Sequence, residues 1–539
     1  MPILHLLAIG VVCFLAITPF FWRGSPSGHD FEFHMFSWME VLSQWKQGIV
    51  FPRWASLAHW GYGEGRFLFY PPASWTVGGA LGALLPWKVV PGAYSWLALT
   101  LAGISMYRLA REWLPGRDAL FTAVLYAVNP YHLLIVYWRS AFAELLAAAL
   151  LPLLLLRILR LNEPGIRQVL GLSLILTGAW LTNAPAAVII HYSAAALAVV
   201  MAVVERSWRP LTRTALAVVL AAGLAAYYLV PAAYEERWIN IGEVLSPGVR
   251  PQDNFLFTTI ADAEHNRFNL LVSVIAAAEI GVLAAAMWFS RSWRQRQRST
   301  WILLACWGGI AAIAMLSITN LLWQHLPKLR FVQLPWRWLL CLNAVLALLL
   351  TMATRRWSAR LLSCVALLAV VIIAGYRIQE PWWDTAADIE EMSDAVSDGA
   401  GFEGTDEYVP EGVDSYELNK DQPQVADSSG HPVRTETVQW GPSEKHFVVH
   451  SKTPEFLTLR LFNYPAWEVT VNGIRVEQQT SDVAGQMEIP VVAGRNDVSI
   501  HFGRTVDRTI GGGISLLCWA VFLMAWIKTR GRSAVGSAG

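Results

Sequence analysis

The residues best suited to chemistry by type and spacing lie between Ser27 and Met39. Asp30 follows His29 directly, and Glu32 stands two positions further on. A carboxylate held at a lipid–water boundary can take a proton from the hydroxyl of an acceptor molecule. Ser27 and Asp30 also have the spacing of a capping box, in which the acid binds a free backbone N–H at a helix start. Both roles stay open, because a capped first turn would hold the carboxylate rigidly.

The residues around Asp30 predict a helix with two different faces. Apolar side chains recur at helical spacing, and polar side chains occupy another face. The apolar set is Phe31, Met35, Trp38, Leu42 and Trp45, and the polar set is Asp30, His34, Ser37 and Gln44. This pattern predicts an amphipathic helix that lies on the membrane surface. The two histidines beside its acids, His29 and His34, are candidates for binding substrate.

A second candidate region ends the same polar segment. Arg66 precedes an aromatic run that leads through Tyr70 into Pro71 and Pro72. Paired prolines are typical of a rigid helix start, and Tyr70 could line a site beneath them. Arg66 and Tyr70 are therefore candidate substrate-binding residues.

Arg139 and Glu144 lie at the outer ends of two apolar runs joined by a short link. An ionisable residue at membrane depth is a functional candidate by default. The alternative is an Arg–Glu pair that only holds two helices together. Both interpretations stay open, and both residues enter the set of candidate substrate-binding residues.

Positive charge gathers once more in the segment from Lys328 to Trp338. It contains Lys328, Arg330 and Arg337, with Gln333 between them and a tryptophan on each side of Arg337. The guanidinium of arginine is a rigid fork that matches phosphate oxygens. The two tryptophans would place Arg337 at the level of lipid headgroups, where the alternative is simple snorkelling to lipid. All four residues are candidates for binding a phosphate-bearing substrate.

The composition shows what kind of scaffold must position these residues. Of 539 residues, 55% are hydrophobic and only 15% are charged, whereas soluble domains carry about 25% charge. The net charge of +1 gives no basic patch for nucleic acid. The five cysteines lie in apolar runs without a CxxC or Cys/His cluster, so a zinc site or disulfide framework is not expected. The chain is a multi-pass membrane protein.

Apolar runs of about 20 residues are long enough to cross a bilayer as helices. We predict about twelve spans, at 3–21, 91–108, 118–136, 141–158, 168–184, 186–204, 213–231, 269–289, 300–319, 335–353, 360–376 and 509–527. Short arginine-rich loops alternate with aromatic, proline-rich or acidic segments, and the basic loops are cytoplasmic by the positive-inside rule. The outer face then holds 23–70, 232–268, 320–334 and 377–508. In a bacterium the membrane would be the inner, cytoplasmic one.

The predicted domain organisation has three parts. Residues 1–376 form a transmembrane module with the outer loop 23–70, and the short Gly-rich, Pro-flanked stretch 71–86 is its one irregular, re-entrant segment. Residues 377–508 combine an acidic linker with alternating strands, and Asn472-Gly473 between two strands predicts a tight hairpin. This part is expected to be a small β-sandwich-like domain. Residues 509–539 form a last span and a basic tail.

With these residues in place, the chain resembles the GT-C class of membrane glycosyltransferases, which use polyprenyl-phosphate-linked sugars. The likeness lies in the anchor helix, the Asp30-x-Glu32 motif on a juxtamembrane helix, the Tyr-Pro-Pro entry, the many spans and the outer C-terminal domain. More narrowly, it is similar to a bacterial multi-pass family labelled 6-pyruvoyl-tetrahydropterin synthase-related. His-Asp at 29–30, RSAFAE at 139–144, QLPWR at 333–337 and GFEGTDEY at 401–408 carry that match. The stretch 464–473 resembles the C-terminal domain of YfhO-like glycosyltransferases.

The resemblance implies a fold, a reaction and partners. The fold would be a mostly α, GT-C-like helical bundle. Asp30 would be the catalytic base that deprotonates the acceptor, and Glu32 would orient the acceptor or a metal ion. The donor's phosphate would bind Arg337, and sugar would pass with inversion to an unknown glycan, lipid or protein acceptor. No cofactor is required, although a divalent metal ion would be compatible with this class. Pterin chemistry is rejected, because its zinc-binding His-x-His pair is missing.

Two other functions use the same residues differently. A transporter or flippase of a lipid-linked saccharide would also need Arg139, Glu144 and the phosphate-binding cations. Such proteins often have paired halves with broken helices in matching places, and only 71–86 breaks the pattern here. The third hypothesis is a non-enzymatic envelope protein that acts through the acidic 377–508 region.

Overall fold

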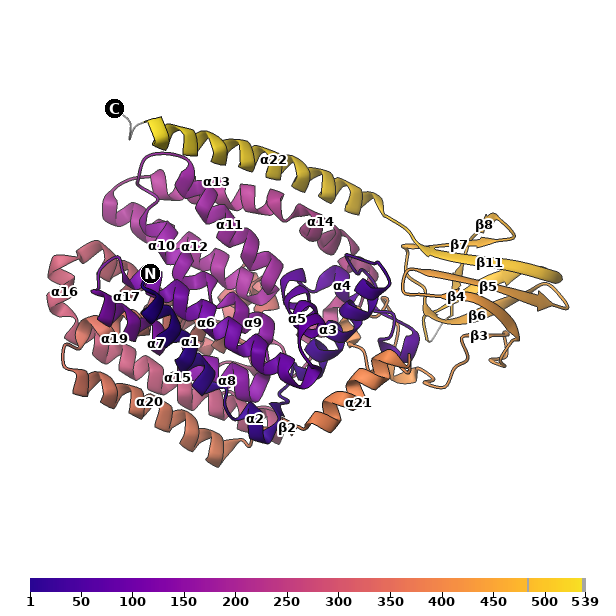
Figure 1. Cartoon of the computed structure of the whole chain (residues 1–539), viewed down its shortest axis with the longest axis horizontal. Helices are drawn as coiled ribbons and strands as arrows, with labels where there is room; N and C mark the ends of the chain where they lie inside the picture. The colour runs from indigo at the N-terminus through magenta and orange to yellow at the C-terminus, as the bar shows by residue number, and fades with distance from the viewer. Residues whose placement is uncertain (482–483, 536–539) are drawn as a thin grey trace.

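The computed structural model describes residues 1–481 and 484–535. A bundle of helices makes up one end of the molecule and a set of strands the other (Figure 1). Within the described residues, nine helices are long and apolar enough to cross a membrane. They are Ile3–Arg23, Trp87–Ala110, Gly116–Arg139, Phe142–Leu159, Ala184–Glu205, Ala263–Phe289, Pro335–Ala353, Trp357–Ile378 and Val506–Thr529. The predicted multi-pass bundle is confirmed.

Two further predicted spans are sharply bent. α13 (Arg209–Leu224) turns by 77° into Ala226–Trp238, and α17 (Arg298–Ala314) turns by 91° into Ser317–His325. The twelfth, predicted at 168–184, is the 16-residue helix α11 (Arg167–Thr182). It is shorter than each of the nine helices named above, but it packs among them.

The expectation that 71–86 is the only irregular segment was wrong, because these two spans are also broken. Side chains stabilise both bends. At the first bend the Ser515 hydroxyl bonds the carbonyls of Gly223 and Leu224, each at 3.1 Å, and accepts the N–H of Tyr227 at 2.8 Å. At the second, Trp323 Nε1 donates to the Ala314 carbonyl at 3.1 Å. These partners satisfy backbone groups that a break in a helix leaves free.

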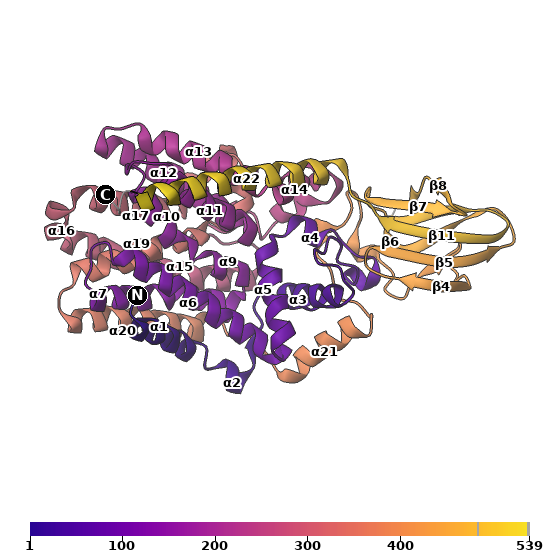
Figure 2. The same ribbon diagram turned by 45° about the horizontal axis from the view of Figure 1, so that its top comes forward.

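The segments predicted to lie outside the membrane meet at one end of the bundle. Figures 1 and 2 show α3 (Phe31–Lys46), α4 (Arg66–Phe69), α5 (Pro72–Leu84) and α21 (Ala386–Ser397) between the bundle and the strands. The arginine-rich α16 (Arg291–Arg296) lies at the opposite end. This arrangement agrees with the alternation of loops, while the side that faces the cytoplasm stays a prediction.

Both faces of helix α3 pack against other parts of the protein, and its place at the membrane surface stays a prediction. Phe31, Met35 and Trp38 on the apolar face are buried, and Leu42 and Trp45 are partly buried. His34, Ser37 and Gln44 on the polar face are buried as well. Helix α5 packs closely on the apolar side, where a Cβ on Gly78 would come within 2.1 Å of the Trp38 ring. On the polar side Gln44 donates to the Trp54 carbonyl at 2.8 Å. Tertiary packing therefore replaces water on the face that the pattern assigned to solvent.

The C-terminal strands form two antiparallel sheets, which confirms the sandwich-like domain. One sheet has the order β3-β6-β10-β9 and the other β4-β5-β11-β7-β8. The strands are β3 (Val425–Ala426), β4 (Thr435–Trp440), β5 (Glu444–Ser451), β6 (Glu455–Phe462), β7 (Trp467–Val471), β8 (Ile474–Val476), β9 (Gln479–Thr480), β10 (Gln486–Val491) and β11 (Gly494–Phe502). Asn472 and Gly473 both have positive φ, 53° and 77°, as the predicted two-residue hairpin requires.

The acidic linker packs against the first outer loop. Strand β2 (Trp383–Asp384) pairs with β1 (Ser25–Pro26), and Thr385 and Asp388 form a capping box at the start of α21. Further along, Phe402 stacks on Phe36 of α3 with ring centroids 4.3 Å apart. The linker thus runs along the bundle end before the chain enters the sheets.

Candidate active site

A cavity of about 750 Å³ opens at the end of the bundle where the outer segments meet. We call it the main cavity. Residues from eight separate stretches line it, including His29, Asp30, Phe33, Phe69, Tyr70, Pro71, Arg139, Ala141, Glu144, Asn183, Val244, Phe268, Gln333, Trp336, Arg337, Thr405, Glu407 and Tyr408. Candidates that lie up to about 300 positions apart in the sequence therefore share one wall.

Asp30 is placed by the crossing of two chain segments. Its backbone N–H donates to the Arg139 carbonyl at 2.9 Å. Two residues earlier, Gly28 N–H donates to the Ser140 hydroxyl at 3.0 Å, and that hydroxyl donates to the Pro26 carbonyl at 2.7 Å. A Cβ on Gly28 would lie 2.3 Å from the Trp138 carbonyl oxygen. Only glycine allows this close approach.

The capping-box interpretation of Asp30 was wrong. Asp30 occupies the N-cap position of α3, but its side chain accepts no capping hydrogen bond. Its Oδ2 instead lies 3.7 Å from Arg139 Nη2, and its side chain is 38% exposed. The carboxylate is thus fixed at its backbone by the crossing and left open at its oxygens to the main cavity.

A buried network of ion pairs continues from Arg139. Glu144 Oε2 accepts from Arg139 Nη1 at 2.5 Å and from Arg337 Nε at 3.0 Å, while Oε1 accepts from the Tyr131 hydroxyl at 2.5 Å. The Arg139 guanidinium also lies over the Trp336 ring, 4.8 Å from its centroid. Glu144 is 1% exposed. One carboxylate therefore holds two guanidiniums in the cavity wall, which is more than the predicted two-helix staple.

Arg337 does not snorkel to lipid, because it and both flanking tryptophans are buried. Its Nη1 donates to the Val332 carbonyl at 2.7 Å and to Gln333 Oε1 at 3.2 Å. Gln333 in turn donates to the Val244 carbonyl at 2.8 Å. This framework fixes the direction of the guanidinium in the main cavity.

Lys328 and Arg330 lie outside the main cavity wall, against the prediction that they join Arg337. Lys328 is 55% exposed and pairs with Glu236 at 3.1 Å. Arg330 is exposed, with its guanidinium 5.1 Å from the centroid of the Phe331 ring. The short helix Leu329–Val332 turns the chain between these residues and Arg337.

The candidates from the first outer loop separate into two groups. Tyr70 lines the main cavity, and His34 lies behind it with ring centroids 5.8 Å apart. Burial lowers the pKa of His34 to about 4, so this ring is neutral at pH 7. Arg66 does not reach the main cavity, contrary to its assignment, because it donates to Glu64 at 2.5 Å and to Ser37 at 3.1 Å. These bonds tie the first outer loop to α3.

Glu32 points away from Asp30. It lines a second cavity of about 530 Å³, which we call the side cavity, while Asp30 lines the main one. Asp30 precedes α3 and Glu32 belongs to its first turn, and two positions in a helix turn the side-chain direction by about 200°. The two acids therefore line different cavities, and the expected role of Glu32 in orienting the acceptor stays a prediction. His29 lines both cavities.

The sequence analysis missed three acids of the main cavity, which are Asp262, Glu264 and Glu407. Glu407 lies in the wall beside Tyr408, and burial raises the pKa of its carboxyl to about 7. Its segment is anchored to the first outer loop, where Thr405 N–H donates to Glu64 Oε2 at 2.8 Å. The stretch 401–408 stood out in the sequence by its motif, but only the fold brings it to Asp30. Within residues 1–481 and 484–535, no three His, Cys, Asp or Glu side chains are grouped to hold a metal ion.

Comparison with known proteins gives similarity of structure only. No family model matches the sequence, and no curated protein matches it. ArnT from Cupriavidus metallidurans superposes with a TM-score of 0.43 and 16% identity over 69% of this chain and 63% of that one. The oligosaccharyltransferase of Archaeoglobus fulgidus gives 0.43 and 14% over 74% and 56%. The mycobacterial arabinofuranosyltransferase AftD gives 0.39 and 17% over 74% and 27%. The chain thus spans less than two thirds of the length of these proteins.

Proposed function

We propose that this protein is a membrane glycosyltransferase that moves a sugar from a polyprenyl-phosphate donor to an acceptor hydroxyl. The observation that carries the proposal is the main cavity, in which an open carboxylate and a rigidly held guanidinium share one wall. Asp30 is exposed to the main cavity and Arg337 is fixed in it by Glu144, Val332 and Gln333. A base and a cation that can bind phosphate are the two groups that this transfer requires.

The reaction is a single displacement. Asp30 takes the proton of the acceptor O–H while the acceptor oxygen bonds to the anomeric carbon of the sugar. The bond from that carbon to the phosphate oxygen breaks, and polyprenyl phosphate leaves with the electron pair. Arg337 stabilises the negative charge that develops on this phosphate. Attack opposite to the leaving group inverts the anomeric configuration.

Glu144 and Arg139 position these two groups. Glu144 bonds both arginines, and Arg139 faces Asp30 at 3.7 Å. The order Asp30, Arg139, Glu144, Arg337 alternates negative and positive charge, so each group is held by the opposite charge beside it. The polyprenyl chain would lie in the bilayer, next to the apolar helices of the bundle.

One observation favours the transporter hypothesis as a second candidate. Transporters use discontinuous helices, and the two bent pairs at Ala225 and at Met315–Leu316 are of that kind. Neither bend contributes a residue to the main cavity wall. The site therefore favours transfer of a sugar over transport of the intact donor.

The test is an assay of the purified chain in lipid nanodiscs with radiolabelled polyprenyl-phosphate sugars. Transfer of label to an acceptor, with release of polyprenyl phosphate, supports the proposal. Movement of intact donor across liposomes without cleavage of the sugar–phosphate bond would establish the transporter instead. Nanodiscs have no inside compartment, so the two activities are separated by design.

We also propose that the first outer loop and the strand domain face the periplasm of a bacterial inner membrane. Single cysteines at Gln47 and Ser429, placed in a cysteine-free background, should both react with an impermeant maleimide added to intact spheroplasts. Both positions are exposed. Label that reaches either site only after lysis would contradict the orientation.

A further inference from the structure

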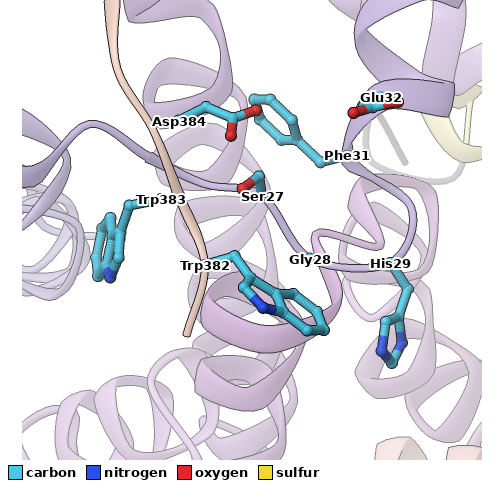
Figure 3. Close-up of a pocket in the computed structure, with 8 residues that line it drawn as sticks. All are labelled: Ser27, Gly28, His29, Phe31, Glu32, Trp382, Trp383 and Asp384. Carbon is cyan, nitrogen blue, oxygen red and sulfur yellow. The ribbon is translucent and has the colours of Figure 1, made fainter. Parts of the chain in front are cut away.

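The side cavity next to the active site is built from the start of α3 and from strand β2. Figure 3 shows the Trp382 indole and the His29 imidazole on one side of the Gly28 backbone. The carboxylates of Glu32 and Asp384 lie on the other side. The cavity holds about 530 Å³, which is enough for one or two sugar rings.

The framework of this cavity is fixed by the backbone. Ser25 pairs with Asp384 in the β1–β2 ladder, and Ser27 N–H donates to the Trp382 carbonyl at 3.1 Å. Successive side chains of a strand point to opposite sides. Trp383 also borders the cavity, but its ring is directed towards the Arg23 guanidinium, which lies 5.7 Å from the ring centroid. The indole of Trp382, which is 38% exposed, is left facing the cavity beside His29.

The charge of the wall decides what can bind there. No Lys or Arg is among the residues that line the side cavity. Burial and the nearby charges of Asp384 and Glu403 raise the pKa of Glu32, and burial raises that of Asp384. A phosphate would add a further negative charge beside these acids. The donor headgroup therefore belongs to the main cavity, where Arg337 lies.

A neutral, hydroxyl-rich ligand fits this wall. Carboxylate oxygens accept hydrogen bonds and can bind several hydroxyl donors. The negative face of an indole attracts the positively polarised C–H edge of a pyranose ring. We propose that the side cavity binds the saccharide portion of the acceptor, adjacent to the hydroxyl that receives the sugar. His29 borders both cavities, so a saccharide held against Trp382 can extend past it towards Asp30.

This inference rests on the proposed function only in naming the ligand as the acceptor. Its test is a binding measurement without donor. The full chain in nanodiscs, free of sugar-headed detergent, is titrated calorimetrically with chitotriose, cellotriose, maltotriose and mannotriose. At least one trisaccharide should bind. Trp382→Ala and Glu32→Gln should each weaken its binding about tenfold, the size of one aromatic or hydrogen-bond contact. Trp22→Ala, at an exposed tryptophan of α2 (Phe20–Arg23), should leave it unchanged.

The outcomes separate this inference from the proposed function. Binding that depends on Trp382 but no sugar transfer would leave the saccharide site standing and overturn the transferase. Transfer without trisaccharide binding, or binding unaffected by Trp382→Ala, would overturn the saccharide site and leave the transferase. Calcium binding abolished by Glu32→Gln, with no trisaccharide bound, would overturn it in favour of a cation site.

Discussion

The main and side cavities have His29 in common and differ in their charges. In the main cavity each acid of the central network faces an arginine, as Asp30 faces Arg139. In the side cavity Glu32 and Asp384 face each other without a cation in the wall. Two acids only two positions apart in the sequence thus have opposite electrostatic surroundings. Under the proposed function, these surroundings and not the motif make Asp30 the base and Glu32 an acceptor of hydrogen bonds.

The largest expected effect is a loss of transfer rate when the acid of the main cavity, but not that of the side cavity, is replaced. Asp30→Asn should fold, insert and bind donor, yet lose about 10²–10⁴-fold in transfer rate, because the amide cannot take a proton. Glu32→Gln is the matched control in the side cavity and should lose less than about tenfold, the size of one hydrogen bond. Initial rates at saturating donor measure both. Equal losses in the two variants would contradict the division between the cavities.

The second effect concerns Arg337, because arginines line only the main cavity. Arg337→Ala should weaken donor binding by about 10–100-fold, since a charged hydrogen bond contributes about 1.5–3 kcal/mol. Arg337→Lys should restore part of it, because an ammonium cannot make the forked contact. Arg330→Ala, at an exposed arginine nearby, is the control and should bind donor normally. Normal donor binding by Arg337→Lys would remove the phosphate role.

The third effect concerns Gly28, which lies where two chain segments cross between the cavities. Gly28→Ala places a methyl group 2.3 Å from the Trp138 carbonyl oxygen, so the two crossing segments must separate. We expect a loss of about 1–3 kcal/mol in the free energy of unfolding, as for overpacked sites, together with a lower turnover number. Gly242→Ala, which has open space around it, should change neither thermal stability nor rate. Wild-type turnover in Gly28→Ala would show that the crossing does not position Asp30.

The smallest effect is a pH dependence in the side cavity. Folding raises the pKa of Glu32 above its usual 4.5, so its neutral form stabilises the fold at low pH. That contribution is lost as the pH rises through the folded-state pKa. The melting temperature of Glu32→Gln minus that of wild type should therefore be larger at pH 8 than at pH 4. Glu436→Gln, exposed on β4, should show no such gain. An opposite sign for Glu32→Gln would contradict the raised pKa of the Glu32 carboxyl.

The sequence alone determined the class of scaffold and some of its local detail. Long apolar runs predicted the helical bundle, alternation predicted the sandwich, and Asn472-Gly473 predicted its hairpin. These features depend on hydrophobicity and on backbone preferences over a few residues, which a local pattern records. The residue types of Asp30, Arg139, Glu144 and Arg337 marked them as candidates, and their roles stay predictions.

Only the tertiary structure decided which candidates meet. It buried the polar face of α3, sent Glu32 into a separate cavity, and left Lys328 and Arg330 on the surface. It joined Arg337 to Glu144 across 193 positions and brought Glu407 into the wall. The physical reason is that spacing fixes the face of a single helix, whereas burial and ion pairing depend on the segments that pack against it. Those segments come from distant parts of the chain, and no local pattern specifies which of them will meet.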